Sequence, residues 1–175
     1  MTPTPHEASA PTGLAGAAFH PHRTAILSEA RRWIGTPYHH RASLRGVGTD
    51  CLGLVRGVWR ALYGEEPEPL PDYTPDWAEA TGAETLLTAA TRHMTPTAKP
   101  VPGDILLFRL RPQGPARHVG FLALNDAPPV RGEAGGGASP PLTLIHALSP
   151  HHVTESALTQ KWQRRVAAAF IFPSP

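Results

Sequence analysis

Apolar residues recur with a helical period twice in the first half of the chain. The first such stretch spans residues 23–34 and ends at Gly35-Thr36-Pro37, a sequence typical of a helix C-terminus. Its apolar face comprises Ile26, Leu27, Ala30, Trp33 and Ile34. The polar side chains expected away from that face are Glu29, Arg31 and Arg32.

The second periodic stretch predicts a helix from Cys51 to Tyr63. Asp50 or Thr49 can serve as its N-cap, and Gly64 closes it. The buried face of this helix is expected to hold Leu54, Val55, Val58 and Leu62. The residues between the two helices, 38–48, are interpreted as a loop.

A third helix is predicted from Asp76 to about Thr91, because Asp76 and Glu79 have the spacing of a capping box. The Pro-rich residues 65–75 before it are interpreted as an extended connector. Strands are predicted over residues 105–110, 118–124, 142–148 and 166–172, with a Gly/Pro loop at 125–141. Because helices come first and strands second, we expect an α+β fold with helices on a central antiparallel sheet.

The chain of 175 residues is long enough for one domain with its own core. Residues 1–20 are interpreted as a flexible arm and residues 21–175 as the domain. The net charge of +2, without a cluster of basic and aromatic residues, gives no indication of nucleic-acid binding. No stretch is long and apolar enough for membrane insertion, and Met1 to Phe19 lacks the features of a secretion signal.

Cys51 is the only cysteine, so the fold contains no internal disulfide. At the first turn of a helix, unpaired N–H groups and the helix dipole favour the thiolate, which is the nucleophilic form. Cys51 is therefore a candidate nucleophile. The alternative is that it serves as a small buried apolar residue, the commoner role of a lone cysteine.

A cysteine nucleophile needs a base and a third group that orients the base. Of ten histidines, His118 and His146 lie at predicted strand positions. An antiparallel register that pairs His118 with His146 and Leu122 with Leu142 puts both imidazoles on one face. One ring nitrogen of His118 then remains for the thiol. Zinc is the competing interpretation, but no H-E-x-x-H or C-x-x-C spacing occurs, and we expect neither metal nor cofactor.

Several short motifs, in order over about residues 23–173, resemble the NlpC-type papain-like cell-wall peptidases, and most closely their phage and gene-transfer-agent branch. They are the segments 33–38 (WIGTPY), 49–55 (TDCLGLV), 102–108 (PGDILLF), 117–120 (RHVG), 144–147 (LIHA), 153–158 (VTESAL) and 164–170 (RRVAAAF).

The resemblance implies a papain-like fold and a cysteine peptidase that cuts the peptide stems of peptidoglycan. It implies Cys51 as nucleophile, His118 as base and His146 as the orienting residue. Tyr38 is expected beside the nucleophile, and Asp50 is expected to hold the amino end of the stem peptide. Leu52 departs from the pattern, because the family usually has Ser after the Cys.

The resemblance also implies a location. We expect a protein made in the cytoplasm, carried by a phage-like virion tail and acting in the periplasm or cell wall, with tail-tip or baseplate proteins as partners. The alternatives are a released endolysin, a non-catalytic tail-assembly protein on a peptidase scaffold, and an acyltransferase or amidase with the same thiol.

Overall fold

The computed structural model describes residues 21–69, 82–125 and 142–174. The expected arm, residues 1–20, the predicted loop apart from Asn125 and most of the connector lie outside these ranges. The helices are α1 (Pro21–Arg31), α2 (Cys51–Tyr63), α3 (Thr85–His93) and the single turn α4 (Gln160–Gln163).

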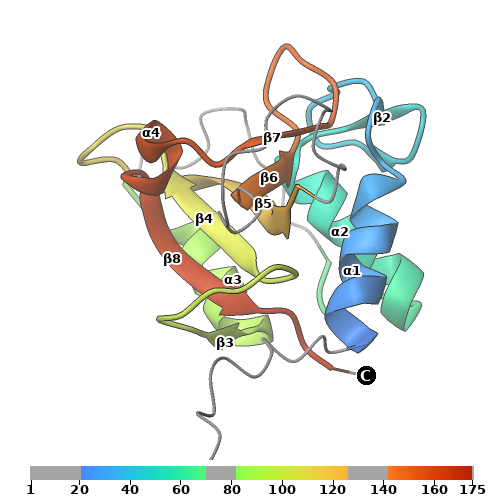
Figure 1. The fold of residues 1–175 in the computed structure, drawn as a ribbon, viewed down its shortest axis with the longest axis horizontal. Coiled ribbons are helices and arrows are strands. Elements are labelled where there is room, and N and C mark those ends of the chain that lie inside the picture. The colour runs from blue at the N-terminus through green and yellow to red at the C-terminus, as the bar shows by residue number, and fades with distance from the viewer. Residues whose placement is uncertain (1–20, 70–81, 126–141, 175) are drawn as a thin grey trace, which may run out of the picture.

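The strands form one large antiparallel sheet and one small hairpin (Figure 1). The order in the large sheet is β3 (Thr95–Pro96), β8 (Val166–Ile171), β4 (Ile105–Arg109), β5 (Ala116–Leu124), β6 (Leu142–His146) and β7 (Thr154–Ala157). The hairpin pairs β1 (Ser43–Leu44) with β2 (Gly48–Thr49) just before α2. The predicted α+β fold, with helices on a central antiparallel sheet, is confirmed.

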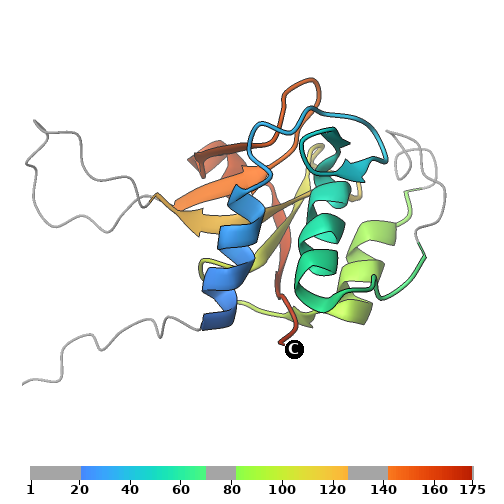
Figure 2. The same cartoon turned by 90° about the vertical axis from the view of Figure 1, so that its right-hand side faces the viewer.

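Helices α1, α2 and α3 lie side by side over one face of the sheet (Figure 2). The main core joins them to alternate strand residues such as Leu107, Val119 and Phe121. The opposite face carries a smaller cluster around Leu122 and Leu144, and Trp162 of α4 packs against it. Side chains alternate between the two faces along a strand, and both faces of β4 and β5 are buried. These two strands are therefore apolar almost throughout.

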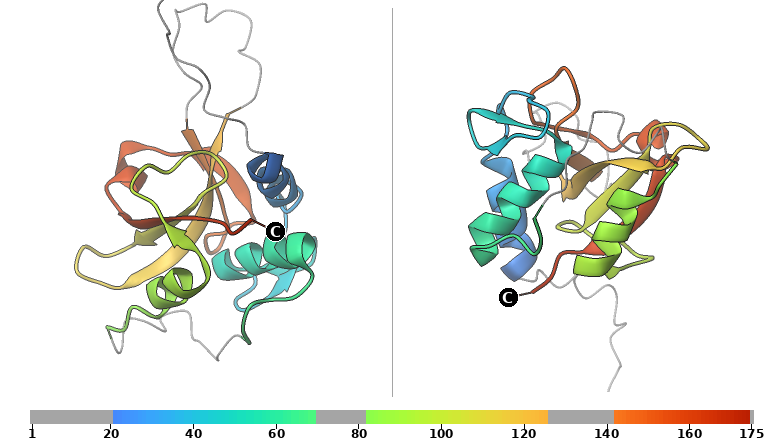
Figure 3. Two further views of the ribbon diagram at one scale, coloured as in Figure 1. Left: turned by 90° about the horizontal axis from the view of Figure 1, so that it is seen from below. Right: turned by 180° about the vertical axis from the view of Figure 1, so that it is seen from behind.

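The C-terminal end of the chain returns to the start of α1 (Figure 3). His22 Nε2 lies 2.5 Å from the carbonyl oxygen of Pro173, and the Tyr63 hydroxyl donates to the same oxygen. Tyr63 also stacks on Phe172. These contacts join α1, α2 and the end of β8 on the side of the molecule away from the first turn of α2.

Helix α2 has the predicted bounds because both ends are capped. The Asp50 carboxylate accepts the N–H of Gly53 at 2.7 Å, and the Gly64 N–H donates to the Arg60 carbonyl. Gly64 has a φ of +85°, which suits glycine. The predicted face is buried at Leu54, Val55 and Val58, and Leu62 packs against the core while partly exposed.

Helix α1 differs from the prediction at its C-terminal end. It ends at Arg31, so Ile34 no longer follows the helical period and is 45% exposed. Glu29, expected away from the core, is buried. Its carboxylate accepts from Trp33 Nε1 and from Arg32, and Arg45 of the hairpin pairs with it at 3.1 Å. These donors compensate for the loss of water around the charge.

The predicted third helix is also wrong at its start. Residues 82–84 are not helical, and Gly82 has a φ of +66°. The Glu84 carboxylate instead accepts the Ala116 N–H at 3.0 Å and pairs with Arg109. Helix α3 therefore begins at Thr85, and the proposed cap at Asp76 lies outside the described residues.

The β5–β6 register differs from the predicted one by two residues. Leu122 pairs with Leu144, and Leu124 pairs with Leu142. The next position along this ladder brings Gly120 opposite His146. A Cβ on Gly120 would lie 2.9 Å from the Ile145 carbonyl oxygen and 3.1 Å from His146 Cβ, so this register needs glycine. An even shift keeps every side chain on its predicted face, and His118 and His146 become diagonal neighbours.

Candidate active site

The segment before α2 fixes where the thiol lies. The Thr49 N–H donates to the Pro37 carbonyl and the His39 N–H donates to the Thr49 carbonyl, both at 3.0 Å. The first turn of α2 then packs directly on the loop backbone, since a Cβ on Gly53 would lie 1.9 Å from the Ala42 carbonyl oxygen. Cys51, the first residue of α2, is thereby held between this loop and the sheet.

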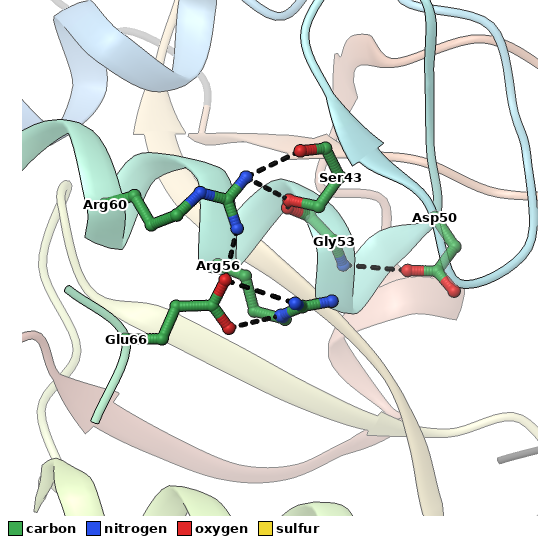
Figure 4. A network of polar contacts seen from close by, with 6 residues as sticks. All are labelled: Ser43, Asp50, Gly53, Arg56, Arg60 and Glu66. Carbon is green, nitrogen blue, oxygen red and sulfur yellow. Dashed lines mark hydrogen bonds and ion pairs between the residues drawn. The ribbon is translucent and has the colours of Figure 1, made fainter. Parts of the chain in front are cut away.

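A network of polar contacts joins the same turn to β1 and to the segment after α2 (Figure 4). The Ser43 hydroxyl donates to the Gly53 carbonyl at 2.5 Å, and Arg60 donates to the Ser43 hydroxyl at 2.8 Å. Glu66 accepts from both Arg60 and Arg56. The network joins β1, α2 and the segment after α2, and so fixes the turn on which Cys51 lies.

The Asp50 carboxylate is 2% exposed and is engaged by the backbone. One oxygen caps Gly53, and the other accepts the Arg41 N–H at 2.7 Å. His40 Nδ1 lies 3.5 Å from the second oxygen. Asp50 thus holds the loop 40–42 against the start of α2, while its expected role in binding a substrate amine stays a prediction.

Cys51 is partly buried, and its thiol is protonated near neutral pH. Burial raises the pKa of the thiol to about 12, with a further contribution from the Asp50 charge. Hydrogen bonds to the sulfur from the N–H groups of Val119, Leu52 and Cys51 itself lower the pKa, but less than burial raises it. The expected preference for thiolate at the helix start is therefore outweighed by desolvation and by the N-cap carboxylate.

Tyr38 lies near Cys51 and Asp50, and its expected role beside a nucleophile stays a prediction. A backbone bridge pairs it with Thr49. Burial raises the pKa of its hydroxyl to about 12, and the nearby Cys51 and Asp50 groups add to the effect. The hydroxyl therefore stays protonated near neutral pH and keeps its hydrogen-bond donor.

The two predicted histidines are in direct contact. His118 Nε2 of β5 lies 2.9 Å from His146 Nδ1 of β6, and His146 Nε2 lies 3.2 Å from the Ser156 hydroxyl of β7. One assignment of the tautomers satisfies both contacts and leaves His118 Nδ1 unprotonated. In it, His118 Nε2–H donates to His146, and His146 Nε2–H donates to Ser156. Sequence reasoning missed Ser156, because β7 was not predicted.

Apolar and aromatic side chains enclose the pair. Trp162 lies with its ring centroid 5.5 Å from His118 and 5.2 Å from His146, and Phe108 lies 5.8 Å from His118. Burial lowers the pKa of His118 to about 3, with smaller effects of His146 and Arg117, and lowers that of His146 to about 4. Both rings are neutral at neutral pH.

Cys51 and the histidine pair approach β5 from its two faces, because Cys51 packs against the helix-side core and Trp162 of the opposite cluster packs on the imidazoles. The core against which Cys51 packs includes Val119, the residue directly after His118. The structure therefore brings Cys51, Tyr38 and Asp50 together around the start of α2, and brings His118 and His146 together on the adjoining strands. Within the described ranges, no group of three His, Cys, Asp or Glu side chains could hold a metal ion.

Comparison with solved structures supports the predicted fold. The chain superposes on an NLP/P60-family protein of Staphylococcus aureus, described as similar to lipoprotein, with a TM-score of 0.54 and 16% identity. The alignment covers 95% of this chain and 46% of the staphylococcal one, so the chain spans about half the length of that protein. At this identity the likeness shows a shared fold.

Two further structures are similar at lower scores. One is the NlpC/p60 domain of the peptidoglycan hydrolase SagA, with a TM-score of 0.49 and 23% identity over 85% of this chain and 97% of that one. The other is an N-acetylmuramoyl-L-alanine amidase of Bacteroides uniformis, with a TM-score of 0.47 and 14% identity over 86% of this chain and 98% of that one. No family model matches the sequence, and no curated protein matches it. No helix among the described residues is long and apolar enough to cross a membrane.

Proposed function

We propose that the protein is a cysteine peptidase that hydrolyses the peptide stems of peptidoglycan. The observation that carries this proposal is the lone thiol at the start of α2 together with the buried imidazole pair of His118 and His146 on the adjoining sheet. The sequence motifs and the NLP/P60-like fold support the substrate class.

The first step follows from the neutral resting pair. His118 Nδ1 takes the thiol proton as the Cys51 sulfur attacks the carbonyl carbon of the scissile amide. The resulting imidazolium keeps its Nε2–H on His146 Nδ1, and His146 donates to Ser156. His146 thus orients the base and holds its tautomer, which is a positioning role.

The charge that develops on the carbonyl oxygen requires donors. The backbone N–H of Cys51 at the helix start supplies one, and the Tyr38 hydroxyl supplies a second. The amine then leaves with the proton from His118, and a thioester remains on Cys51. Water, deprotonated by His118, hydrolyses the thioester and restores the thiol and the neutral imidazole.

The test is digestion of purified peptidoglycan with mass spectrometry of the released muropeptides. Cys51→Ala is expected to abolish release of cleaved stems, and His118→Ala to lower the rate more than His146→Ala. Full activity of the Cys51→Ala protein would contradict the proposal. Transfer of the acyl group to an amine, instead of hydrolysis, would favour the acyltransferase alternative.

We further propose that the protein acts at the cell wall as part of a phage-like tail tip, in contact with tail-tip or baseplate proteins. This role is supported by the sequence resemblance to the phage and gene-transfer-agent branch. Mass spectrometry of purified particles should detect the chain. Its absence from particles, together with its presence in lysates that clear cell walls, would indicate a released endolysin instead.

A further inference from the structure

A cleft of about 500 Å³ lies between helices α2 and α3, which run side by side in Figure 2. Its floor is formed by Leu107 and Val119 of the sheet. The rest of its apolar lining comes mainly from the two helices and includes Leu52, Val55, Trp59, Leu86, Ala90 and Met94. None of these residues belongs to the proposed catalytic set.

The cleft adjoins the thiol through two of its walls. Leu52 follows Cys51 in the first turn of α2 and lines the cleft. Val119 also lines the cleft, and Cys51 packs against the core cluster that includes Val119. A group bound at this end of the cleft therefore lies next to the atom proposed to attack the substrate.

The charged side chains that line the cleft already have partners. Glu66 pairs with Arg56, Glu68 pairs with Arg92, and Glu84 pairs with Arg109 outside the lining. His93 Nε2 lies 3.3 Å from Glu68 but is a buried atom without a hydrogen bond, so it leaves the lining one polar position for a neutral group. Within the described lining, a charged ligand group would have to compete with an existing ion pair, and a buried charge without a partner is unfavourable.

We propose that this cleft is the subsite for the substrate group next to the scissile carbonyl. It takes an uncharged and mainly apolar group, and Leu52 determines this specificity. The proposal rests on the proposed function for its link to catalysis. For a stem peptide, it favours a residue whose side chain is apolar, or whose carboxylate is amidated, over one with a free carboxylate. Leu52, where the resembling family has a serine, supplies apolar surface at the thiol end of the cleft.

The test measures binding with the nucleophile removed. Neutral primary amides from butanamide to octanamide are titrated into the Cys51→Ala protein by calorimetry. We expect Kd to fall about fourfold for each added methylene, as the burial of a CH₂ group predicts. Hexanamide should bind at least about tenfold more tightly than 6-amino-6-oxohexanoate, which has a carboxylate at the far end.

Three variants of the Cys51→Ala protein test whether the amide binds in the cleft. Ala89→Trp fills the cleft from α3 and should remove the dependence on chain length. Thr91→Trp adds the same bulk at an exposed α3 position outside the lining and should leave it intact. Leu52→Ser should weaken octanamide binding by about tenfold, since one apolar wall is lost. Equal binding of all amide lengths, or a length dependence that Ala89→Trp leaves unchanged, would overturn the proposal.

A second measurement links the cleft to the thiol. In the protein with Cys51 intact, saturating octanamide should slow alkylation of the thiol by iodoacetamide, and Thr91→Trp should show the same protection. Binding without protection would contradict a subsite at the nucleophile. Digestion of peptidoglycan tests the proposed function separately, because it compares the wild-type protein with Cys51→Ala and does not depend on amide binding.

Discussion

Acidification from pH 7 to pH 5 should destabilise the protein through its buried histidine pair. His118 and His146 are 2% and 5% exposed, and burial lowers the pKa of each ring, to about 3 and about 4. In the unfolded chain a histidine has a pKa of about 6.5. Between the folded and the unfolded pKa, the unfolded state therefore binds more protons, and stability falls as the pH falls.

The size of the effect follows from the same values. At pH 5 an unfolded histidine is almost fully protonated while the folded rings are largely neutral, so each ring lowers the free energy of unfolding by about 2 kcal/mol relative to pH 7. The pair together contributes about 4 kcal/mol, a large part of the 5–15 kcal/mol that is typical of a domain. Below pH 4 the rings charge in the folded state too, and this contribution levels off.

Urea unfolding at pH 7, 6 and 5 measures this difference, and His146→Gln is the matched variant because it keeps a polar side chain at the same site. It should lose about half of the pH dependence. NMR titration of the imidazole signals should show both rings neutral at pH 5. An unchanged pH dependence in the variant, or rings that titrate near pH 6.5, would refute the reasoning.

Three further substitutions test the surroundings of the site. Gly120→Ala should lower the free energy of unfolding by about 1–3 kcal/mol in urea denaturation, because the new methyl meets the Ile145 carbonyl at 2.9 Å. Asp50→Asn should speed alkylation of the Cys51 thiol at pH 8, since the Asp50 charge raises the pKa of the thiol. Ser156→Ala should lower the rate of stem cleavage by about two- to tenfold, the value of one neutral hydrogen bond.

Each of these substitutions has an outcome that contradicts its premise. A Gly120→Ala protein as stable as wild type would mean that β5 and β6 do not approach as described. Slower alkylation in Asp50→Asn would indicate that the carboxylate acts on the thiol other than through its charge. A Ser156→Ala rate equal to that of wild type would show that His146 needs no partner on β7.

The ends of a helix were predictable from sequence where both caps are local. Helix α2 has the predicted bounds because Asp50 and Gly64 are strong local signals whose bonds form within a few residues. At the C-terminal end of α1 the prediction was wrong, and there Glu29 is buried with two local donors, Arg32 and Trp33, and one that the tertiary structure brings, Arg45 of the hairpin. Burial of a charge depends in part on such distant donors, which hydrophobic periodicity does not encode.

The edge of the sheet shows a second limit. Strand β7 has the sequence Thr-Glu-Ser-Ala, without apolar alternation. It is an edge strand that pairs with β6 alone, so its side chains are less buried than those of the central strands. Two of its side chains make polar contacts, since Ser156 lies against His146 and the Glu155 carboxylate pairs with Arg31 of α1. Trp162 lies on a single helical turn, too short for a period to be visible.

The histidine pair was predicted on a register that is wrong, and the reason it still forms is general. The face of a strand residue depends on parity alone, so a shift of two residues changes which side chains are opposite but not which share a face. Diagonal neighbours on one face still lie within reach of an imidazole, and the ring nitrogens meet at 2.9 Å. A shift of one residue would have placed His146 on the helix side of the sheet, away from His118. The sequence therefore determines the histidine contact more firmly than it determines the register. Gly120 selects between the registers that parity allows, because its missing side chain leaves room for His146.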